Sequence, residues 1–363
     1  MERITALVDE ALATGLGTAG LGSAAAISIG DAGREVARLL RGRTRRIPDA
    51  GPRIDDRTYF DVASLTKPMS TVACAMVLVG DGALDLDTPI RRYLDRATST
   101  GTVRQLLGHS AGCAAHVEFF RALRDAPPAD PYAELVAQAT REPAASEPGT
   151  VAVYSDLGFI MLGAIIERVA NRPLAEAFAD MVATPLELSA RFVPASADAL
   201  ESVVATELDE RGVVTGRVHD ENCYYGGGVA GHAGLFARLD DVSRFAAAIV
   251  ACAAGESRGR FKPEVVKHFL TDAPLAGSTW RLGWDTPSLQ PGVSQAGDRW
   301  PRRFGIGHTG FTGTSMWLDL QNRRWSVLLT NRVHPSRHGS ADAIKSLRRA
   351  VNDAVVELLD PAR

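Results

Sequence analysis

The strand-forming segments of this chain lie near its two ends, and the long stretch between them has mainly helical patterns. Near the start, the apolar run Ala24 to Ile29 is followed by turn-forming residues at Gly30-Asp31-Ala32-Gly33, which predicts a hairpin. Near the end, strand patterns extend from about Arg281 to Thr330. The sheet is therefore expected to take strands from both chain ends, with a helical portion inserted between them.

This distribution predicts an α+β fold of two domains, and a length of 363 residues is enough for both. We expect residues 1–85 and 240–363 to form a sheet domain and residues 86–239 to form a mostly helical domain. A first helix is predicted over 4–13 and a last helix over 341–359. The active site is expected in the cleft between the two domains.

Ser64 and Lys67 are three residues apart at the predicted start of a helix. At this spacing both side chains lie on one helix face, so the lysine amine can reach the serine hydroxyl. A serine hydroxyl is a weak nucleophile unless a neighbouring base activates it. The dipole and free N–H groups of a helix start also favour the negative charge of an attacking alkoxide. The alternative is that Ser64 only caps the helix and Lys67 is a solvated surface residue.

Two further segments favour the catalytic interpretation. Tyr154-Ser155-Asp156 presents a phenol and a carboxylate at the start of an apolar helix predicted from Leu157 to Ala170. Far downstream, His308-Thr309-Gly310 lies on a predicted strand. In order and spacing, the three motifs resemble the signature of the serine β-lactamase and penicillin-binding protein superfamily, which is S-x-x-K, a Tyr- or Ser-led triplet and K-T-G.

The resemblance extends over nearly the whole chain, including the blocks 106–112, 227–236 and 307–314, and is closest to the class C-like branch of esterases and D,D-peptidases. It implies a β-lactamase/transpeptidase-like fold, in which an antiparallel sheet is flanked by helices and carries an inserted, mostly helical domain. Asp156 stands where lactam-cleaving members usually carry asparagine, and His308 stands where they usually carry lysine. Both departures resemble the esterase and peptidase-related members and lower the expected β-lactam hydrolysis.

The resemblance also implies a role for each motif. Ser64 attacks an acyl carbon, while Lys67 and Tyr154 move the proton from the attacking hydroxyl to the leaving group, with no metal or cofactor. The Lys67 ammonium is expected to make the Tyr154 phenol easier to ionise than in water. The oxyanion is expected between the N–H groups of Ser64 and Phe311. His308 either orients the phenol or binds a polar end of the substrate.

The substrate is expected to contact Asp156, Thr309, Gly310 and His232. The Asp156 carboxylate also favours the protonated form of the Lys67 amine. His232 lies among glycines, so a glycine-rich turn without a substrate contact is the alternative for this residue.

Two glycine-containing patterns match known motifs in letters but not in context. Residues 108–112 spell the G-x-S-x-G nucleophile elbow around Ser110, but that elbow follows a strand, whereas a short helix is predicted over 102–107. Residues 15–20 spell the dinucleotide-binding G-x-G-x-x-G, but they follow a helix and lead into a strand, which is the reverse of the required order. We therefore expect ordinary turns at both places.

Two side-chain clusters have ordinary explanations as well. The acidic and histidine residues near the middle of the chain lack the short recurrent spacing of metal ligands, and no metal site is predicted at His219, Asp220, Glu221 and His232. The arginines of the second predicted strand and its exit loop are expected to form a solvated face, or else a patch beside the cleft that attracts anionic substrates: Arg34, Arg38, Arg41, Arg43, Arg45 and Arg46.

A net charge of −3 gives no broad basic surface for nucleic acid. No membrane-spanning segment is expected, and the first ten residues carry acids where a secretory signal peptide has an apolar core, so a cytoplasmic location is expected. The four cysteines have no framework spacing, and Cys74 is expected to be reduced and buried.

These observations predict a serine hydrolase that forms an acyl-enzyme on a small-molecule ester or amide, with a carboxylesterase as the first hypothesis. The alternatives within the same chemistry are a D-amino-acid peptidase or D,D-carboxypeptidase with at most weak β-lactamase activity, and an acyltransferase. A non-catalytic binding module on the same fold is the alternative from a different class. The sequence gives no oligomeric state.

Overall fold

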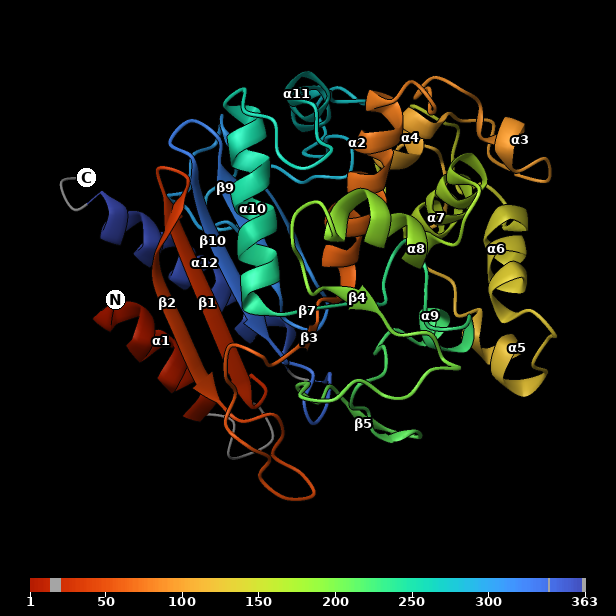
Figure 1. Ribbon diagram of the computed structural model, residues 1–363. Helices are drawn as coiled ribbons and strands as arrows, with labels where there is room; N and C mark the ends of the chain where they lie inside the picture. Colours follow the sequence, from red (N-terminus) through yellow and green to blue (C-terminus); the bar gives the residue numbers. More distant parts are fainter. Residues whose placement is uncertain (14–20, 339, 361–363) are drawn as a thin grey trace.

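A five-stranded antiparallel sheet forms one side of the molecule in the computed structural model, which describes residues 1–13, 21–338 and 340–360 (Figure 1). The strand order is β2-β1-β10-β9-β8. The strands are β1 (Ala24–Asp31), β2 (Arg34–Gly42), β8 (Gly305–Thr309), β9 (Ser315–Asp319) and β10 (Arg324–Thr330). Residues 14–20, where the dinucleotide-type glycine motif falls, lie outside the described residues.

Strand β1, which lies next to the edge strand β2, joins the two ends of the chain. It pairs with β2 on one side and with β10 on the other, where Ala25 lies opposite Thr330 and Ile27 opposite Leu328. Because successive side chains point to opposite faces of a strand, Ile27 packs into one core and its neighbour Ala26 into another. The prediction that one sheet takes strands from both chain ends is confirmed.

Helices cover both faces of the sheet (Figure 1). On one face α1 (Glu2–Ala13) and α12 (Ala341–Leu359) contact each other and share a core with the sheet. On the other face α10 (Leu239–Ala253) packs against β1, β9 and β10, and α11 (Pro263–Thr271) packs against α10. The resulting layers of helix, sheet and helix are those of the predicted α+β fold.

The rest of the molecule is mostly helical and lies beside the sheet (Figure 1). Its helices are α3 (Ile90–Tyr93), α4 (Val103–Leu107), α5 (Phe120–Asp125), α6 (Pro131–Arg141), α7 (Asp156–Ala170), α8 (Leu174–Phe178), η4 (Ala179–Ala183) and α9 (Glu221–Tyr225). Two small sheets complete it, formed by β3 (Phe60–Asp61), β7 (Leu235–Ala237) and β4 (Arg191–Phe192), and by β5 (Leu208–Asp209) and β6 (Gly212–Val213). The division into two domains at residues 85 and 239 stays a prediction.

One expected stretch of strand is wrong. The interval 281–300 contains turns and bends, and its single ladder contact is the isolated bridge between Asp285 and Gly307. Its glycines explain the difference, since Gly283, Gly292 and Gly297 all have positive φ values that a regular strand does not accommodate. The regular strands begin only at Gly305.

The segment after Ser64 forms the central helix of the core. It consists of a 3-10 turn, η2 (Ala63–Leu65), a π-helix, η3 (Lys67–Val72), and an α-helix, α2 (Ala73–Gly80). The span Ala63–Gly80 is long and apolar enough to cross a membrane, with a mean hydropathy of 1.3, but 83% of it is buried inside the fold. The predicted helix is therefore present, although it is not a regular α-helix.

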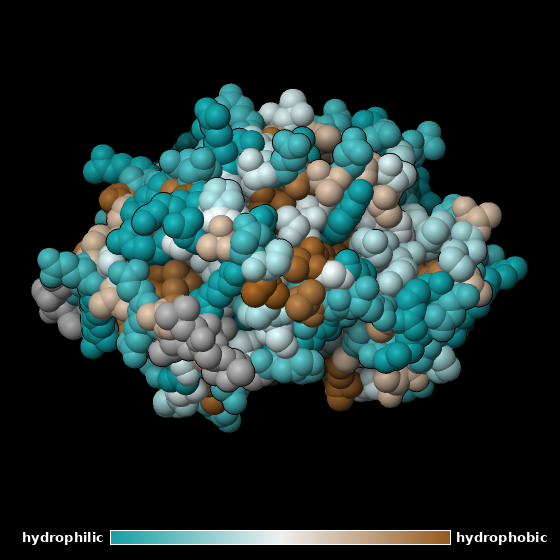
Figure 2. Space-filling model, turned by 90° about the horizontal axis from the view of Figure 1, so that it is seen from below, coloured by the Kyte–Doolittle hydropathy of each residue, from teal (hydrophilic) through white to brown (hydrophobic). Residues whose placement is uncertain are grey.

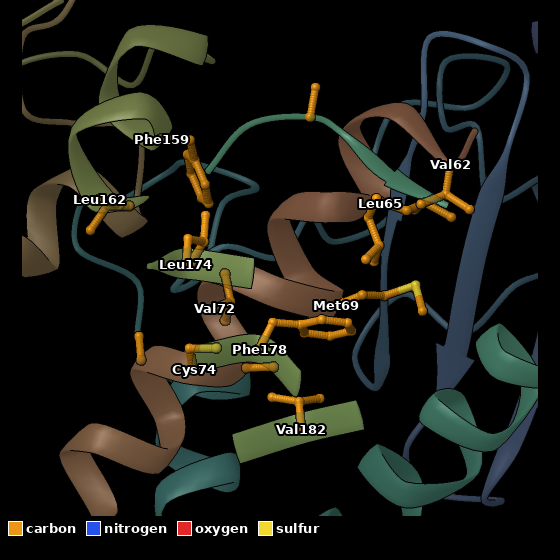
Figure 3. Close-up of a cluster of buried hydrophobic side chains, with 14 of the residues drawn as sticks. Val62, Leu65, Met69, Val72, Cys74, Phe159, Leu162, Leu174, Phe178 and Val182 are labelled. Atoms are coloured by element: carbon orange, nitrogen blue, oxygen red, sulfur yellow. The ribbon is translucent and has the colours of Figure 1, made fainter. Parts of the chain in front are cut away.

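Figure 3 shows how this central helix is held. Val62, Leu65, Met69 and Val72 lie close to side chains from α7, α8 and η4, and Cys74 is fully buried as predicted, with a free thiol. A helix packed on all sides gives Ser64 and Lys67 a rigid support.

The lower face of the molecule is mainly hydrophilic, with hydrophobic residues gathered in small groups (Figure 2).

Candidate active site

Ser64 follows a sharp turn at the end of β3. The preceding residue, Ala63, has φ of +49°, a left-handed conformation that costs a non-glycine residue about 1–2 kcal/mol. The turn is held because Asp61 accepts a hydrogen bond from the Ala63 N–H at 2.8 Å and Thr314 Oγ1 donates to the Val62 carbonyl at 2.9 Å. The Ser64 side chain is thereby fixed at the wall of a cavity of about 640 Å³.

Lys67 has no exposed side-chain surface and makes three hydrogen bonds. Its Nζ donates to Ser64 Oγ at 3.0 Å, to Asp156 Oδ1 at 2.8 Å and to the His232 carbonyl at 3.1 Å. An ammonium group has three N–H donors, so this arrangement uses all of them. Burial lowers the pKa of Lys67, but the Asp156 carboxylate acts in the opposite direction and the net pKa is raised. The resting amine is therefore protonated.

Tyr154 lies beside Lys67, with Lys67 Nζ 4.8 Å from the centre of the phenol ring. Ser155 caps α7 by accepting a hydrogen bond from the Gly158 N–H at 3.1 Å, which fixes the direction of the preceding segment. Burial raises the pKa of Tyr154, and the opposing effect of Lys67 does not cancel it. The expectation that the phenol ionises more easily than in water is therefore wrong, because burial outweighs the neighbouring ammonium.

Asp156 is the first residue of α7 and lies between two cationic groups. Its second oxygen, Oδ2, is 3.3 Å from His116 Nδ1, while Oδ1 accepts from Lys67. Burial alone would raise the pKa of Asp156, but Lys67 and His116 hold it well below its usual range. Hydrogen bonding to Asp156 in turn raises the pKa of His116. No spacing pattern in the sequence points to His116, which reaches the site from a loop.

We predict that Asp156→Asn moves the rising limb of the pH–rate profile of Ser64 acylation to lower pH. The carboxylate raises the pKa of Lys67, so its removal lets the amine lose its proton at lower pH. The rate of Ser64 modification by a fluorophosphonate, measured from pH 6 to 11, gives the profile. Asp220→Asn is the matched control, because Asp220 lines the same cavity but pairs with His232. An unshifted limb in Asp156→Asn would contradict the assigned protonation.

His308 lies on β8, at the cavity wall, and is 2% exposed. Its Nδ1 is 2.8 Å from the Thr309 carbonyl, which fixes the proton on Nδ1. Burial, reinforced by the charge of Lys67, lowers the pKa of His308 to about 3, so the ring is neutral near pH 7. Its Nε2 is then an acceptor, and it has no partner among the described residues. His308 thus places a neutral hydrogen-bond acceptor at the motif position where lactam-cleaving members usually carry a lysine.

The two proposed oxyanion donors belong to residues that line the same cavity, Ser64 and Phe311. Phe311 directly follows Thr309 and Gly310 after β8, and all three line the cavity together with Ser64. Gly310 donates to the Thr314 carbonyl at 2.7 Å, whereas the Phe311 N–H has no acceptor among the described residues. That N–H is available for a substrate oxygen.

His232 takes a different place from the expected one. Its side chain is 1% exposed and its Nε2 lies 2.9 Å from Asp220 Oδ1, behind the cavity wall. The cavity is instead lined by the next residue, Ala233, and the His232 carbonyl binds Lys67. The expected substrate contact of the His232 side chain is therefore wrong, because this side chain is used to pair with Asp220.

Several cavity residues carried no sequence signal. Arg332 and Arg348 are each 5% exposed, and their guanidinium groups bind carbonyl, amide and hydroxyl oxygens, with no carboxylate ion pair among the described residues. Burial lowers the pKa of Arg348 to about 9. Isolated arginines have no motif, so only the folded chain shows them at the site. The other lining residues without a sequence signal include His116, Trp280, Asp285 and Gln295.

Three of the patterns set aside in the sequence fall within the described residues, and one of them, at His219, Asp220 and Glu221, lines the cavity. Ser110 is fully buried, follows helix α4 and is absent from the cavity wall. His219 pairs with Glu207 at 2.9 Å, and the described residues contain no group of three or more metal-ligating side chains. Arg38, Arg41 and Arg45 form ion pairs with acidic residues and do not line the cavity.

Comparison with known proteins identifies the family. A profile of the Beta-lactamase family matches residues 8–349, so the chain belongs to that family. A protein of Escherichia coli (strain K12), provisionally named D-alanyl-D-alanine carboxypeptidase, is 28% identical over 313 residues, which cover 76% of this chain and 70% of that protein. The family match and this relative show that the chain is a serine hydrolase.

Solved structures show the same fold. A class C β-lactamase from Rhodobacter sphaeroides superimposes with a TM-score of 0.71 at 17% identity, covering 99% of this chain and 100% of that one. EstCE1, described as a hydrolase with promiscuous acyltransferase activity, superimposes with a TM-score of 0.70 at 21% identity, covering 98% and 97%. The β-lactamase/transpeptidase-like fold predicted from the sequence is thereby confirmed.

Proposed function

We propose that this enzyme cleaves carboxylic esters through an acyl-enzyme on Ser64. The observation that supports the proposal is the convergence of an alcohol, an amine and a phenol: Ser64 and Tyr154 line the cavity, and the buried Lys67 Nζ lies 3.0 Å from Ser64 Oγ and 4.8 Å from the centre of the Tyr154 ring. This is the arrangement of a nucleophile with acid–base partners.

The reaction begins when the buried group of Lys67, Tyr154 and Asp156 has lost one proton. Ser64 Oγ bonds to the acyl carbon as its own proton passes to this group, and the carbonyl oxygen becomes an oxyanion held by the N–H groups of Ser64 and Phe311. The C–O bond to the leaving group then breaks, and the alkoxide takes up the proton. Water attacks the acyl-enzyme by the same steps in reverse and releases the acid.

The resting protonation state favours esters over amides. Lys67 is held as an ammonium by Asp156, and the Tyr154 phenol is neutral, so the strongest bases of the site are largely protonated near pH 7. A site with little free base activates its serine weakly, and the carbonyl carbon of an ester is attacked more easily than that of an amide. Activated esters are therefore the substrates that this site is best suited to cleave.

A carboxypeptidase is the second candidate, and the charge of the cavity favours it. Arg332 and Arg348 bring buried positive charge to the wall near Gly310 without an ion-paired carboxylate among the described residues. A buried charge without an opposite charge is costly, and a substrate carboxylate would relieve that cost. The Escherichia coli relative is provisionally named for such an activity. Peptides that end in a free carboxylate are the substrates of this alternative.

Intact-mass measurement after exposure to a fluorophosphonate tests the proposed nucleophile, with peptide mapping of the adduct. We expect one adduct, on the peptide that contains Ser64, and its absence or its location on Ser110 would overturn the proposal. A panel of p-nitrophenyl esters, D-alanyl-D-alanine peptides and nitrocefin then ranks the substrates. Faster turnover of the peptides than of the esters would favour the carboxypeptidase, and transfer of the acyl group to added alcohols would reveal an acyltransferase.

A further inference from the structure

His109 holds the backbone on both sides of Tyr154. Its carbonyl accepts a hydrogen bond from the Val153 N–H at 2.8 Å, and its Nδ1 accepts one from the Ser155 N–H at 3.1 Å. These two bonds bracket Tyr154, the residue between them. His109 lies in the turn after α4, so it links the helical part of the molecule to the segment that carries the phenol.

The imidazole ring of His109 also packs against the phenol itself. The ring centres of His109 and Tyr154 are 4.8 Å apart, and Trp280 lies 4.4 Å from His109 and 5.3 Å from Tyr154. The three rings form a compact group at the base of the cavity, where Tyr154 and Trp280 line the wall. Movement of the phenol away from Lys67 would disturb both ring contacts.

The protonation state of His109 suits this role. Nδ1 accepts a hydrogen bond from a backbone N–H, so the ring proton lies on Nε2, which has no partner among the described residues. Burial, together with the positive charge of Lys67, holds the pKa of His109 well below its usual range. The charged and titratable groups that act on it are Lys67, His308 and Asp156. His109 therefore stays neutral and keeps its acceptor across the working pH range.

The backbone of His109 is strained in a way that serves these contacts. Its φ is +55°, in the left-handed region that asparagine tolerates better than most residues with a side chain. This conformation directs both the carbonyl and the ring toward the segment 153–155. The G-x-S-x-G sequence around Ser110 therefore lies in a turn that supports the phenol segment. Within this sequence, His109 is the residue that makes the contacts.

We propose that His109 is a positioning residue that fixes the Tyr154 phenol within reach of Ser64 and Lys67. This inference rests on the proposed function, because it assigns His109 the task of placing an acid–base group of that reaction. Displacement of a reacting group by about 1 Å can lower a rate about a hundredfold. The side chain of His109 has no place on the cavity wall, and its effect is transmitted through Tyr154.

Three variants separate the contacts of His109. His109→Phe keeps a packed ring and removes the acceptor for Ser155, whereas His109→Asn keeps an acceptor close to the position of Nδ1 and tolerates the left-handed backbone. Ser110→Ala is the matched control, because the Ser110 Oγ is buried without a hydrogen bond to the phenol segment. Thermal melting shows whether each variant is folded at the assay temperature.

The rate of Ser64 labelling by a fluorophosphonate, measured across pH, is the first readout. We expect His109→Phe to label about a hundredfold more slowly with a displaced rising limb of its pH profile, His109→Asn to remain within about tenfold of wild type, and Ser110→Ala to be unchanged. A His109→Phe variant that labels at the wild-type rate with the same pH profile would overturn the proposal. So would a slow variant whose pH profile is unchanged, since that result indicates a general structural role.

Amide hydrogen exchange at Val153 and Ser155 is the second readout and does not depend on activity. We expect faster exchange at Ser155 in His109→Phe than in wild type, because this amide loses its acceptor. If wild type shows no labelling of Ser64, the proposed function fails, and exchange alone then decides the positioning. Unchanged exchange at Ser155 would overturn the role of His109 in either case.

Discussion

Ser64→Ala will lower ester turnover by at least about ten-thousandfold and abolish the fluorophosphonate adduct. Ser64 is the aliphatic hydroxyl on the cavity wall that contacts the Lys67 amine, at 3.0 Å. The substitution removes one oxygen and leaves the turn at Ala63 in place, so folding is expected to be preserved. Initial rates with p-nitrophenyl butyrate and intact-mass spectrometry measure the two effects.

Ser110→Ala is the control for this result. Both serines lie in turns next to helices, but Ser110 is buried away from the cavity and Ser64 lies on its wall. We expect Ser110→Ala to retain turnover and the adduct. Loss of the adduct in Ser110→Ala, with retention in Ser64→Ala, would identify Ser110 as the nucleophile and contradict the assignment of Ser64.

Lys67→Ala is expected to lower the acylation rate by roughly a hundredfold or more, the usual scale for lost acid–base assistance. The amine is the group that joins Ser64 to Asp156, at 3.0 Å and 2.8 Å, so its loss interrupts the path of the proton. Pre-steady-state release of p-nitrophenol separates acylation from hydrolysis of the acyl-enzyme. A burst as fast as that of wild type would show that another group removes the serine proton.

Stability must be measured beside this rate, because Lys67 is also half of a buried ion pair. Breaking such a pair from one side is destabilising, because Asp156 keeps its charge in a poorly solvated place with only His116 beside it. The double variant Lys67→Ala with Asp156→Asn removes both charges and is expected to melt at a higher temperature than Lys67→Ala alone. If the double variant is stable and still acylates slowly, the loss belongs to catalysis and not to unfolding.

Much of the fold could be predicted from the sequence, because local apolar patterns indicate where most of its strands and helices lie. The apolar run of β1, the last three strands and the helix Ala341–Leu359 follow from local patterns, and the pairing of chain ends follows from where the strands lie. Ser64, Lys67, Tyr154 and His308 could be found because they belong to ordered motifs. The irregular structure of segment 281–300 could not be predicted, because a loop without hydrophobic periodicity can resemble short strands in sequence.

The electrostatics of the site depended on distances that no sequence contains. The protonation of Lys67 is set by an Asp156 oxygen at 2.8 Å, and that carboxylate is in turn held by His116. The phenol of Tyr154 was expected to ionise easily from its neighbour alone, but burial decides the direction. Burial is a property of the whole fold. The same is true of the presence at the site of Arg348, which lies on the last helix.

The pairing of β1 with β10 has a consequence for synthesis on the ribosome. Residue 25 is translated about 300 residues before its partner at residue 330, so strand β1 must wait with an apolar edge unpaired. Contacts of such long sequence separation form slowly, and nascent chains with unpaired edges are prone to aggregate. A messenger that ends before β8 would yield a polypeptide with its nucleophile but no sheet to complete the pocket, and chaperone binding to the growing chain would be of most use during this interval.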